Sequence, residues 1–201
     1  LILGLKNDTG YYRAMTWNFW IDPVVDNVCQ EEIFMKLRRS VLSVPGHMKK
    51  MHSKAMNSAV DIVMFDLEDS VPVDQKKAAR AQVIQSLLSL DWRDKTVTVR
   101  CNALDTPFAY RDLLEVVENA GQVLDAVVVP KVNHPGDIHF VHRLLEGIEM
   151  NKQCSNRIGI EASIESAVGL ENVSLTARAS DRMISLIFGI ADYSASIGAR
   201  L

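Results

Sequence analysis

RIGIEASIESAVGL (157–170), a helical segment and RMISLIFGIADYSASIG (182–198) together decide the fold of this chain. Each quoted stretch holds an almost wholly apolar run typical of a buried strand, and the helix between them predicts neighbouring strands of a parallel sheet. Each run leads into an acid, Glu165 or Asp192, so both carboxylates are expected at the edge where α/β proteins bind ligands. Two carboxylates at one edge predict a site for one hard divalent cation.

Glu165 and Asp192 also have a purely structural interpretation. Acidic residues are favoured at helix N-termini, so each carboxylate could cap the helix that follows it. We favour the metal site because other functional side chains are predicted at the same edge.

The alternation of strand and helix extends back to Ser40. The other predicted strands span 40–45, 60–67, 96–101 and 124–130, and the predicted helices end near 58 or span 74–90, 108–120, 136–150 and 167–179. Right-handed crossovers repeated along the chain curl a parallel sheet in one direction. The expected fold class is therefore α/β, of the (β/α)8 barrel type.

The length of the chain bears on this expectation. A closed barrel needs about 250 residues, and this chain has 201, so we expect a barrel truncated after about six βα units. An open doubly wound sheet is the alternative, but it carries a glycine-rich turn after its first strand. Here that turn reads VPGHMKK (44–50), which lacks the GxGxxG pattern.

The composition is that of an ordinary globular protein, with 48% hydrophobic and 23% charged residues. A net charge of -3 gives no global reason to bind nucleic acid or an anionic membrane. No apolar run reaches the roughly 18 residues of a membrane span. The three cysteines share no metal-like spacing, which favours a reducing compartment. We expect a cytoplasmic protein, or one of the mitochondrial matrix if the source is eukaryotic.

Residues 1–34 differ from the rest of the sequence. They show no clear hydrophobic period, lack the order of regions of a secretory signal, and are too acidic for an organelle presequence. We expect an N-terminal extension outside the fold, followed by a partial barrel domain over 35–201. Met35 stands where a natural start is expected, just before the first strand.

The first predicted strand and its helix carry Ser43, Val44, Lys49 and Lys54. Backbone N–H groups at a helix start, with lysines nearby, are a plausible seat for a phosphate. A solvated basic helix face explains the same lysines equally well.

The second and third strands bring charges of both signs to the edge. Asp66, Glu68 and Asp69 lie so close in sequence that they repel one another unless cations or donors lie among them. Arg100 ends an apolar strand and offers a planar fork to a carboxylate or an enolate-like oxygen. Asp66 could pair with Arg100 or with Lys131, and Lys131 is expected to be an ion-pair partner and not a Schiff-base nucleophile.

Six sequence motifs resemble those of a known protein family. The segments RRSVLSVPG, VDIVMFDLEDSV, VRCNALDTP, VVVPKV, IEASIESAVGLEN and FGIADYSASIG, in this order, resemble the citrate lyase β-chain and malyl-CoA lyase family of the aldolase/citrate lyase superfamily. The resemblance runs from Arg39 to the end of the sequence. The malyl-CoA lyase branch is the most similar, on the segments LDTPFAYRDLLEVVENAG and FGIADYSASIGAR.

The resemblance implies roles for individual residues. Glu165 and Asp192 would hold Mg2+, with Mn2+ as a possible substitute. Arg100 would contact the acyl or keto-acid oxygens, and Glu68 and Asp69 would lie near the water ligands of the metal; these three are the expected catalytic residues. The residues expected to bind substrate are Ser43, Val44, Lys49, Lys54, Arg100, Ala191 and Asp192, the first four on the CoA side.

The implied function is a Mg2+-dependent carbon–carbon lyase that cleaves a 3-hydroxyacyl-CoA such as malyl-CoA into acetyl-CoA and glyoxylate, or catalyses the reverse condensation. The partners would be a CoA thioester and a small 2-keto acid, with no nucleic acid and no membrane, in a homo-oligomer such as a trimer or hexamer. A citrate lyase β-chain-like subunit, a thioesterase or malate-synthase-like enzyme, and a non-catalytic truncated binding protein remain alternatives.

Two departures from the family pattern qualify this expectation. Met48 stands where the family commonly has an arginine, so phosphate binding would rest on Lys49. The family's C-terminal lid, which supplies an acid to a neighbouring subunit, is not in this sequence, and no general base is identified. We therefore expect the chain to bind metal and to lack part of the catalytic apparatus.

Overall fold

The computed structural model describes residues 37–200, and the predicted N-terminal extension lies outside this range. Six parallel strands form one sheet in the order of the sequence, β1-β2-β3-β4-β5-β6. The strands are β1 (Val41–Pro45), β2 (Ile62–Asp66), β3 (Thr96–Arg100), β4 (Ala126–Val129), β5 (Gly159–Ile164) and β6 (Met183–Phe188).

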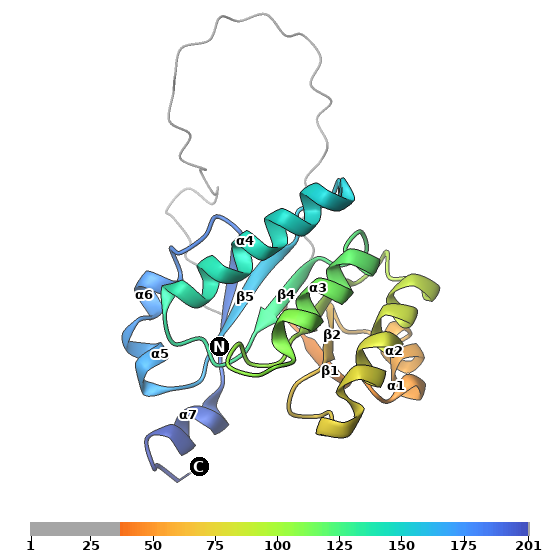
Figure 1. The fold of residues 1–201 in the computed structure, drawn as a ribbon. Helices are drawn as coiled ribbons and strands as arrows, with labels where there is room; N and C mark the ends of the chain where they lie inside the picture. The colour runs from red at the N-terminus through yellow and green to blue at the C-terminus, as the bar shows by residue number, and fades with distance from the viewer. Residues whose placement is uncertain (1–36, 201) are drawn as a thin grey trace, which may run out of the picture. The chain divides into compact units, whose positions relative to one another are not determined.

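Helices connect the strands and cover one face of the sheet (Figure 1). The helices are α1 (Lys49–Met56), α2 (Lys76–Ser89) after a 3-10 turn η1 (Val73–Gln75), α3 (Ala109–Ala120), α4 (Pro135–Lys152), α5 (Ala167–Glu171), α6 (Val173–Thr176) and α7 (Ile190–Ser196). Figure 1 shows α7 beyond the end of β6, apart from the helices that cover the sheet.

The hydrophobic core lies between the sheet and these helices. Alternate residues of a strand point to opposite faces, and the core side is filled by apolar side chains. On β2, Phe65 packs edge-on against His52 of α1 and Trp92, with ring centroids 4.8 Å and 5.4 Å away. The other face carries polar groups, such as Asp66 on β2 and Arg100 on β3, and these are aligned by the pairing of the two strands.

The predicted fold class is confirmed: the sheet has the strand order of consecutive barrel units, and each predicted strand is present within one or two residues of its expected start. The helix predicted over 167–179 is wrong, because it is two short helices that meet at Asn172. The Asn172 side chain donates to the Asn133 backbone carbonyl at 3.0 Å, a tertiary contact that no local pattern reveals.

The sixth strand also differs from the prediction. It ends at Phe188, Gly189 follows, and Asp192 lies in the first turn of α7 and not directly at the strand end. Among the described strands, β6 lies at an edge of the sheet. Apolar side chains on it and in or just after α7 are exposed: Ile184, Phe188, Ile190 and Ile197. Within residues 37–200, no helix has the length and apolar character needed to cross a membrane.

Candidate metal and substrate site

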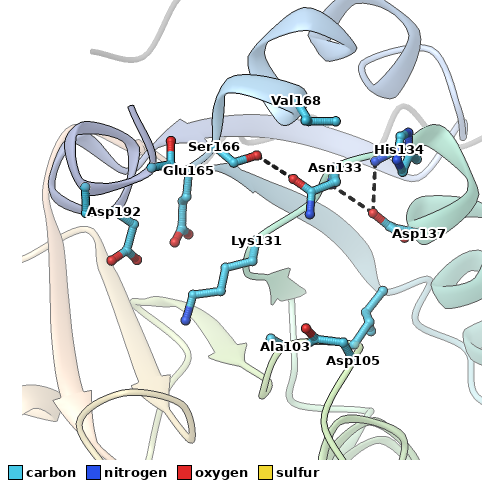
Figure 2. A pocket seen from close by; sticks show the side chains of 13 residues that line it. Ala103, Asp105, Lys131, Asn133, His134, Asp137, Glu165, Ser166, Val168 and Asp192 are labelled. Carbon is cyan, nitrogen blue, oxygen red and sulfur yellow. Dashed lines mark hydrogen bonds between the residues drawn. The ribbon is translucent and has the colours of Figure 1, made fainter. Parts of the chain in front are cut away.

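Glu165 and Asp192 are brought together at the carboxyl end of the sheet. Glu165 directly follows β5, and Asp192 comes from α7. Figure 2 shows both carboxylates beside one another at the wall of a hollow of about 820 Å³. Both residues also line a second hollow of about 380 Å³. We call the first the loop-side hollow and the second, which strand residues such as Met64 and Val128 line, the sheet-side hollow.

Glu165 does not cap the helix that follows it. The capping residue of α5 is Ser166, whose hydroxyl oxygen accepts a hydrogen bond from the Gly169 N–H at 3.0 Å. Asp192 lies in the first turn of α7, where an acid is compatible with the helix dipole, although its side chain makes no capping hydrogen bond. The alternative interpretation is therefore wrong for Glu165 and holds in part for Asp192.

The environment of Glu165 disfavours its negative charge. Burial, a hydrogen bond with Asp192 and the negative charge of Glu68 together raise the pKa of Glu165 to about 7. A bound cation relieves such repulsion between carboxylates. Mg2+ is usually held by one or two carboxylates and keeps water or substrate at its other positions. The oxygen donors of Glu165 and Asp192 fit this requirement.

Among residues 37–200, no group of three or more His, Cys, Asp or Glu side chains is arranged to hold an ion.

Arg100 forms an ion pair with Asp66. The sequence left open whether Asp66 pairs with Arg100 or with Lys131, and the structure shows Arg100. Its Nε and Nη2 atoms donate to the two carboxylate oxygens of Asp66, each at 2.8 Å. Asp66 is completely buried, and burial alone would raise its pKa, but the hydrogen bonds and charge of Arg100 lower it. Arg100 lines the sheet-side hollow together with Glu165 and Asp192. Its guanidinium has five N–H donors, more than the two that Asp66 accepts.

Glu68 lies between two cations. Lys131 donates to it at 2.7 Å, and Arg100 Nη1 is 3.3 Å from its other oxygen. Burial raises the pKa of Glu68 even though both cations oppose this effect. Lys131 is also 3.6 Å from Asp69, which confirms it as an ion-pair partner. Asp69 lines the sheet-side hollow, whereas Glu68 is not among the described residues that line either hollow.

The sequence analysis missed Lys76, a buried cation on α2. Its ammonium group donates to the backbone carbonyls of Leu67 at 2.8 Å and Glu68 at 2.6 Å. These bonds fix the backbone of the segment that carries the acids. Its position just after an acidic 3-10 turn gave no sign that this lysine points inward.

The loop-side hollow has an ordered polar wall on its far side from Asp192 (Figure 2). The Ser166 hydroxyl donates to the side-chain oxygen of Asn133. Asp137 accepts the backbone N–H groups of Asn133 at 2.9 Å and His134 at 3.0 Å, which forms a capping box at the start of α4. Sequence analysis missed Asn133, because its side chain and its backbone carbonyl bond to Ser166 and Asn172, which lie 33 and 39 residues further along the chain.

The residues predicted on the CoA side lie on β1 and α1. Ser43 and Lys54 are exposed, and Lys49 donates to Gln85 at 3.2 Å. The Val44 side chain is in the core and only 1% exposed. None of these four is among the described residues that line the two hollows, whereas Ala191 lines the sheet-side hollow. The structure therefore brings Glu68, Asp69, Arg100, Glu165, Ala191 and Asp192 into one region.

Comparison with known proteins finds similar sequences and a similar structure. The profile of the HpcH/HpaI aldolase/citrate lyase family matches residues 39–200. An L-malyl-CoA/beta-methylmalyl-CoA lyase from Rhodobacter capsulatus is 40% identical over 163 residues, which is 81% of this chain and 51% of the relative. A citrate lyase subunit beta from Leuconostoc mesenteroides subsp. cremoris is 36% identical, over 79% of this chain and 52% of the relative.

A solved structure is also similar. Protein CitE from Mycobacterium tuberculosis, in complex with magnesium, acetoacetate and coenzyme A, matches with a TM-score of 0.65 and 26% identity, over 82% of this chain and 54% of that one. The chain spans about half the length of the curated relatives it matches.

Proposed function

The chain belongs to the HpcH/HpaI aldolase/citrate lyase family, and on this premise we propose that it contributes the metal and keto-acid site of a Mg2+-dependent carbon–carbon lyase. The substrate would be a 3-hydroxyacyl-CoA such as malyl-CoA, cleaved to acetyl-CoA and glyoxylate, or formed from them in reverse. The observation that carries the proposal is the pair Glu165 and Asp192, adjacent at the carboxyl end of a parallel sheet and next to Arg100.

Glu165 and Asp192 would hold the cation through carboxylate oxygens. When bound, Mg2+ would act as a Lewis acid toward the carbonyl or hydroxyl oxygen of the substrate. The relative complexed with magnesium, acetoacetate and coenzyme A supports this assignment. Mn2+ would serve as a substitute ion and as a spectroscopic probe.

Arg100 would orient the substrate in the sheet-side hollow. Asp66 holds the guanidinium plane in place, so the donors directed at the hollow need no reorganisation during the reaction. Such pre-arranged donors, aimed at an oxygen that gains negative charge, contribute about 3 to 4 kcal/mol to catalysis in well-studied cases. Glu68 and Lys131 would keep this arrangement rigid, because Glu68 contacts both cations. We assign the catalytic proton transfer to no residue of this chain.

The test measures metal binding first and cleavage of malyl-CoA second. The chain is titrated with Mn2+ and followed by electron paramagnetic resonance, and malyl-CoA is then added with Mg2+ while acetyl-CoA and glyoxylate are measured. We expect one bound ion per chain and, in a version of the protein that carries the C-terminal lid, products only with the metal. Asp192→Ala should abolish both and leave the circular dichroism spectrum unchanged.

The matched control is Asp105→Ala, which removes another acid of the loop-side hollow but leaves the pair intact. Equal metal affinity in the wild type and in Asp192→Ala would refute the proposed site. Metal binding without cleavage of any acyl-CoA would instead support a non-catalytic binding protein.

A citrate lyase β-type activity is the second candidate, because a citrate lyase subunit beta is 36% identical to this chain, against 40% for the malyl-CoA lyase. A substrate panel of malyl and citryl thioesters separates the two. Release of free CoA with malate and without glyoxylate would favour a thioesterase or a malate-synthase-like enzyme. The homo-oligomer, the CoA contacts on β1 and α1, and the cytoplasmic location stay predictions.

A further inference from the structure

Gly189 lies directly against the side chain of Glu165. It forms the single-residue link between β6 and α7. A Cβ atom at position 189 would lie 2.5 Å from Cγ and 3.0 Å from Cδ of Glu165. Both distances are far shorter than an ordinary carbon–carbon contact of about 3.5 to 4.0 Å. The Glu165 chain therefore occupies the space that any other residue at 189 would need for its first side-chain atom.

The backbone at Gly189 does not itself require glycine. Its dihedral angles, φ -90° and ψ 86°, lie near the inverse γ-turn region that other L-residues adopt. The requirement for glycine at this position is therefore steric and not conformational.

The backbone at Gly189 is also held on both sides. Its N–H donates to the carbonyl of Ile164 at 3.1 Å, and its carbonyl accepts from the Tyr193 N–H at 3.0 Å. These bonds link the end of β5, which Glu165 directly follows, to the first turn of α7, which carries Asp192. The backbone therefore cannot withdraw from an added methyl group without breaking one of these bonds, and the Glu165 side chain must move instead.

From these contacts we propose that Gly189 is a positioning residue that seats the Glu165 carboxylate beside Asp192, so that both can bind one divalent cation. This inference rests on the proposed function, since it concerns the same metal site. An added methyl group would displace Glu165 by about 1 Å to restore normal contact. Mg2+ accepts little deviation from oxygen distances of about 2.0 to 2.1 Å, so such a shift separates the two carboxylates as joint ligands.

The experiment compares Gly189→Ala with Gly147→Ala and the wild type. Gly147 lies in α4, and a Cβ atom there would meet nothing within 4 Å. The readout is Mn2+ affinity by electron paramagnetic resonance, with circular dichroism as the check of folding. Gly189→Ala should bind Mn2+ at least about tenfold more weakly, as found when residues that orient metal ligands are lost. Gly147→Ala should bind as the wild type does.

A double-mutant cycle tests the steric mechanism without the metal. Gly189→Ala should lower the urea midpoint of the wild type, but much less that of Glu165→Ala, which lacks the Cγ and Cδ atoms that the methyl group meets. This comparison remains informative even if Gly189→Ala alone fails to fold, because the double variant should then recover the fold. Equal effects in both backgrounds would overturn the inference and show that Gly189 serves the backbone alone.

The outcomes distinguish this inference from the function on which it rests. If the wild type binds Mn2+ and Gly189→Ala binds it equally well, the positioning role is refuted and the metal site stands. If the wild type binds no Mn2+, the proposed function fails and the role of Gly189 toward a metal fails with it.

Discussion

Burial and a neighbouring acid both disfavour the negative charge of Glu165. The pKa of this carboxyl rises from an ordinary 4.5 to about 7. Between these two pH values the folded, metal-free protein keeps a proton that the unfolded chain has released. The free energy of unfolding therefore falls as the pH rises through this range.

Glu165→Gln should remove this part of the pH dependence. In EDTA, the loss of unfolding free energy between pH 5 and pH 8 should be smaller in the variant, by on the order of 2 kcal/mol. Urea denaturation at the two pH values measures the difference. Glu68, whose pKa is also raised by burial, is present in both proteins, so the difference reports Glu165 together with its interaction with Glu68. Parallel pH profiles would contradict the assignment.

Asp66 depends on Arg100 for its charge. The carboxylate is fully buried, and Arg100 supplies two of its hydrogen bonds. Arg100→Met should lower the free energy of unfolding by about 3 kcal/mol, because it leaves a buried charge without its partner. Urea denaturation measures this loss. Adding Asp66→Leu should recover a large part of this loss. A double variant no more stable than Arg100→Met would show that the unpaired charge of Asp66 does not cause the loss.

Among the elements, α2 supports the acidic segment after β2. Lys76 holds the carbonyls of Leu67 and Glu68, while the N–H groups of Glu68 and Ser70 donate to Asp66 at 2.8 Å and 3.1 Å. Lys76→Met should loosen this segment and speed hydrogen exchange at these two amides by about tenfold or more, which corresponds to a loss of about 1.4 kcal/mol of local stability.

Lys77→Met is the matched control, since Lys77 is adjacent and exposed. Exchange at the amides of Glu68 and Ser70 should then stay at the wild-type rate. Equal acceleration in both variants would mean that helix charge, and not the buried contact, controls the segment.

At the scale of the elements, the sequence predicts the alternation of strands and helices and misses contacts between residues of different segments. The alternation of apolar strands with helices was sufficient for the fold class, because a buried parallel strand has a distinctive composition. The positions of Glu165 and Asp192 at one edge followed from the same rule. Gly189 and Lys76 were not predicted, because their roles depend on contacts with other segments, and the break at Asn172 depends on a bond to Asn133.

At the scale of the whole molecule, the β6 edge is the feature with the clearest physical consequence. Ile190 and Ile197, in and just after α7, are 61% and 49% exposed, and β6 pairs on one side only among the described strands. Exposed apolar side chains at an open edge promote association. We expect the chain as described to self-associate with increasing concentration, as measured by sedimentation velocity.

The double variant Ile190→Lys and Ile197→Lys should shift this equilibrium toward the monomer, while Met150→Lys should not. Met150 is a suitable control because it is 71% exposed on α4, which is not part of this edge. If Met150→Lys has the same effect, general surface hydrophobicity and not the β6 edge drives the association.

The strict neighbour order of the strands has a consequence for synthesis. Each described strand from β2 onward pairs with the one made just before it, so none of these pairings has to wait for a distant part of the chain. Each βα unit can thus dock onto its predecessor as it leaves the ribosome. Glu165 follows the fifth strand and Asp192 follows the sixth, so the carboxylate pair is complete only after all six described strands have been made.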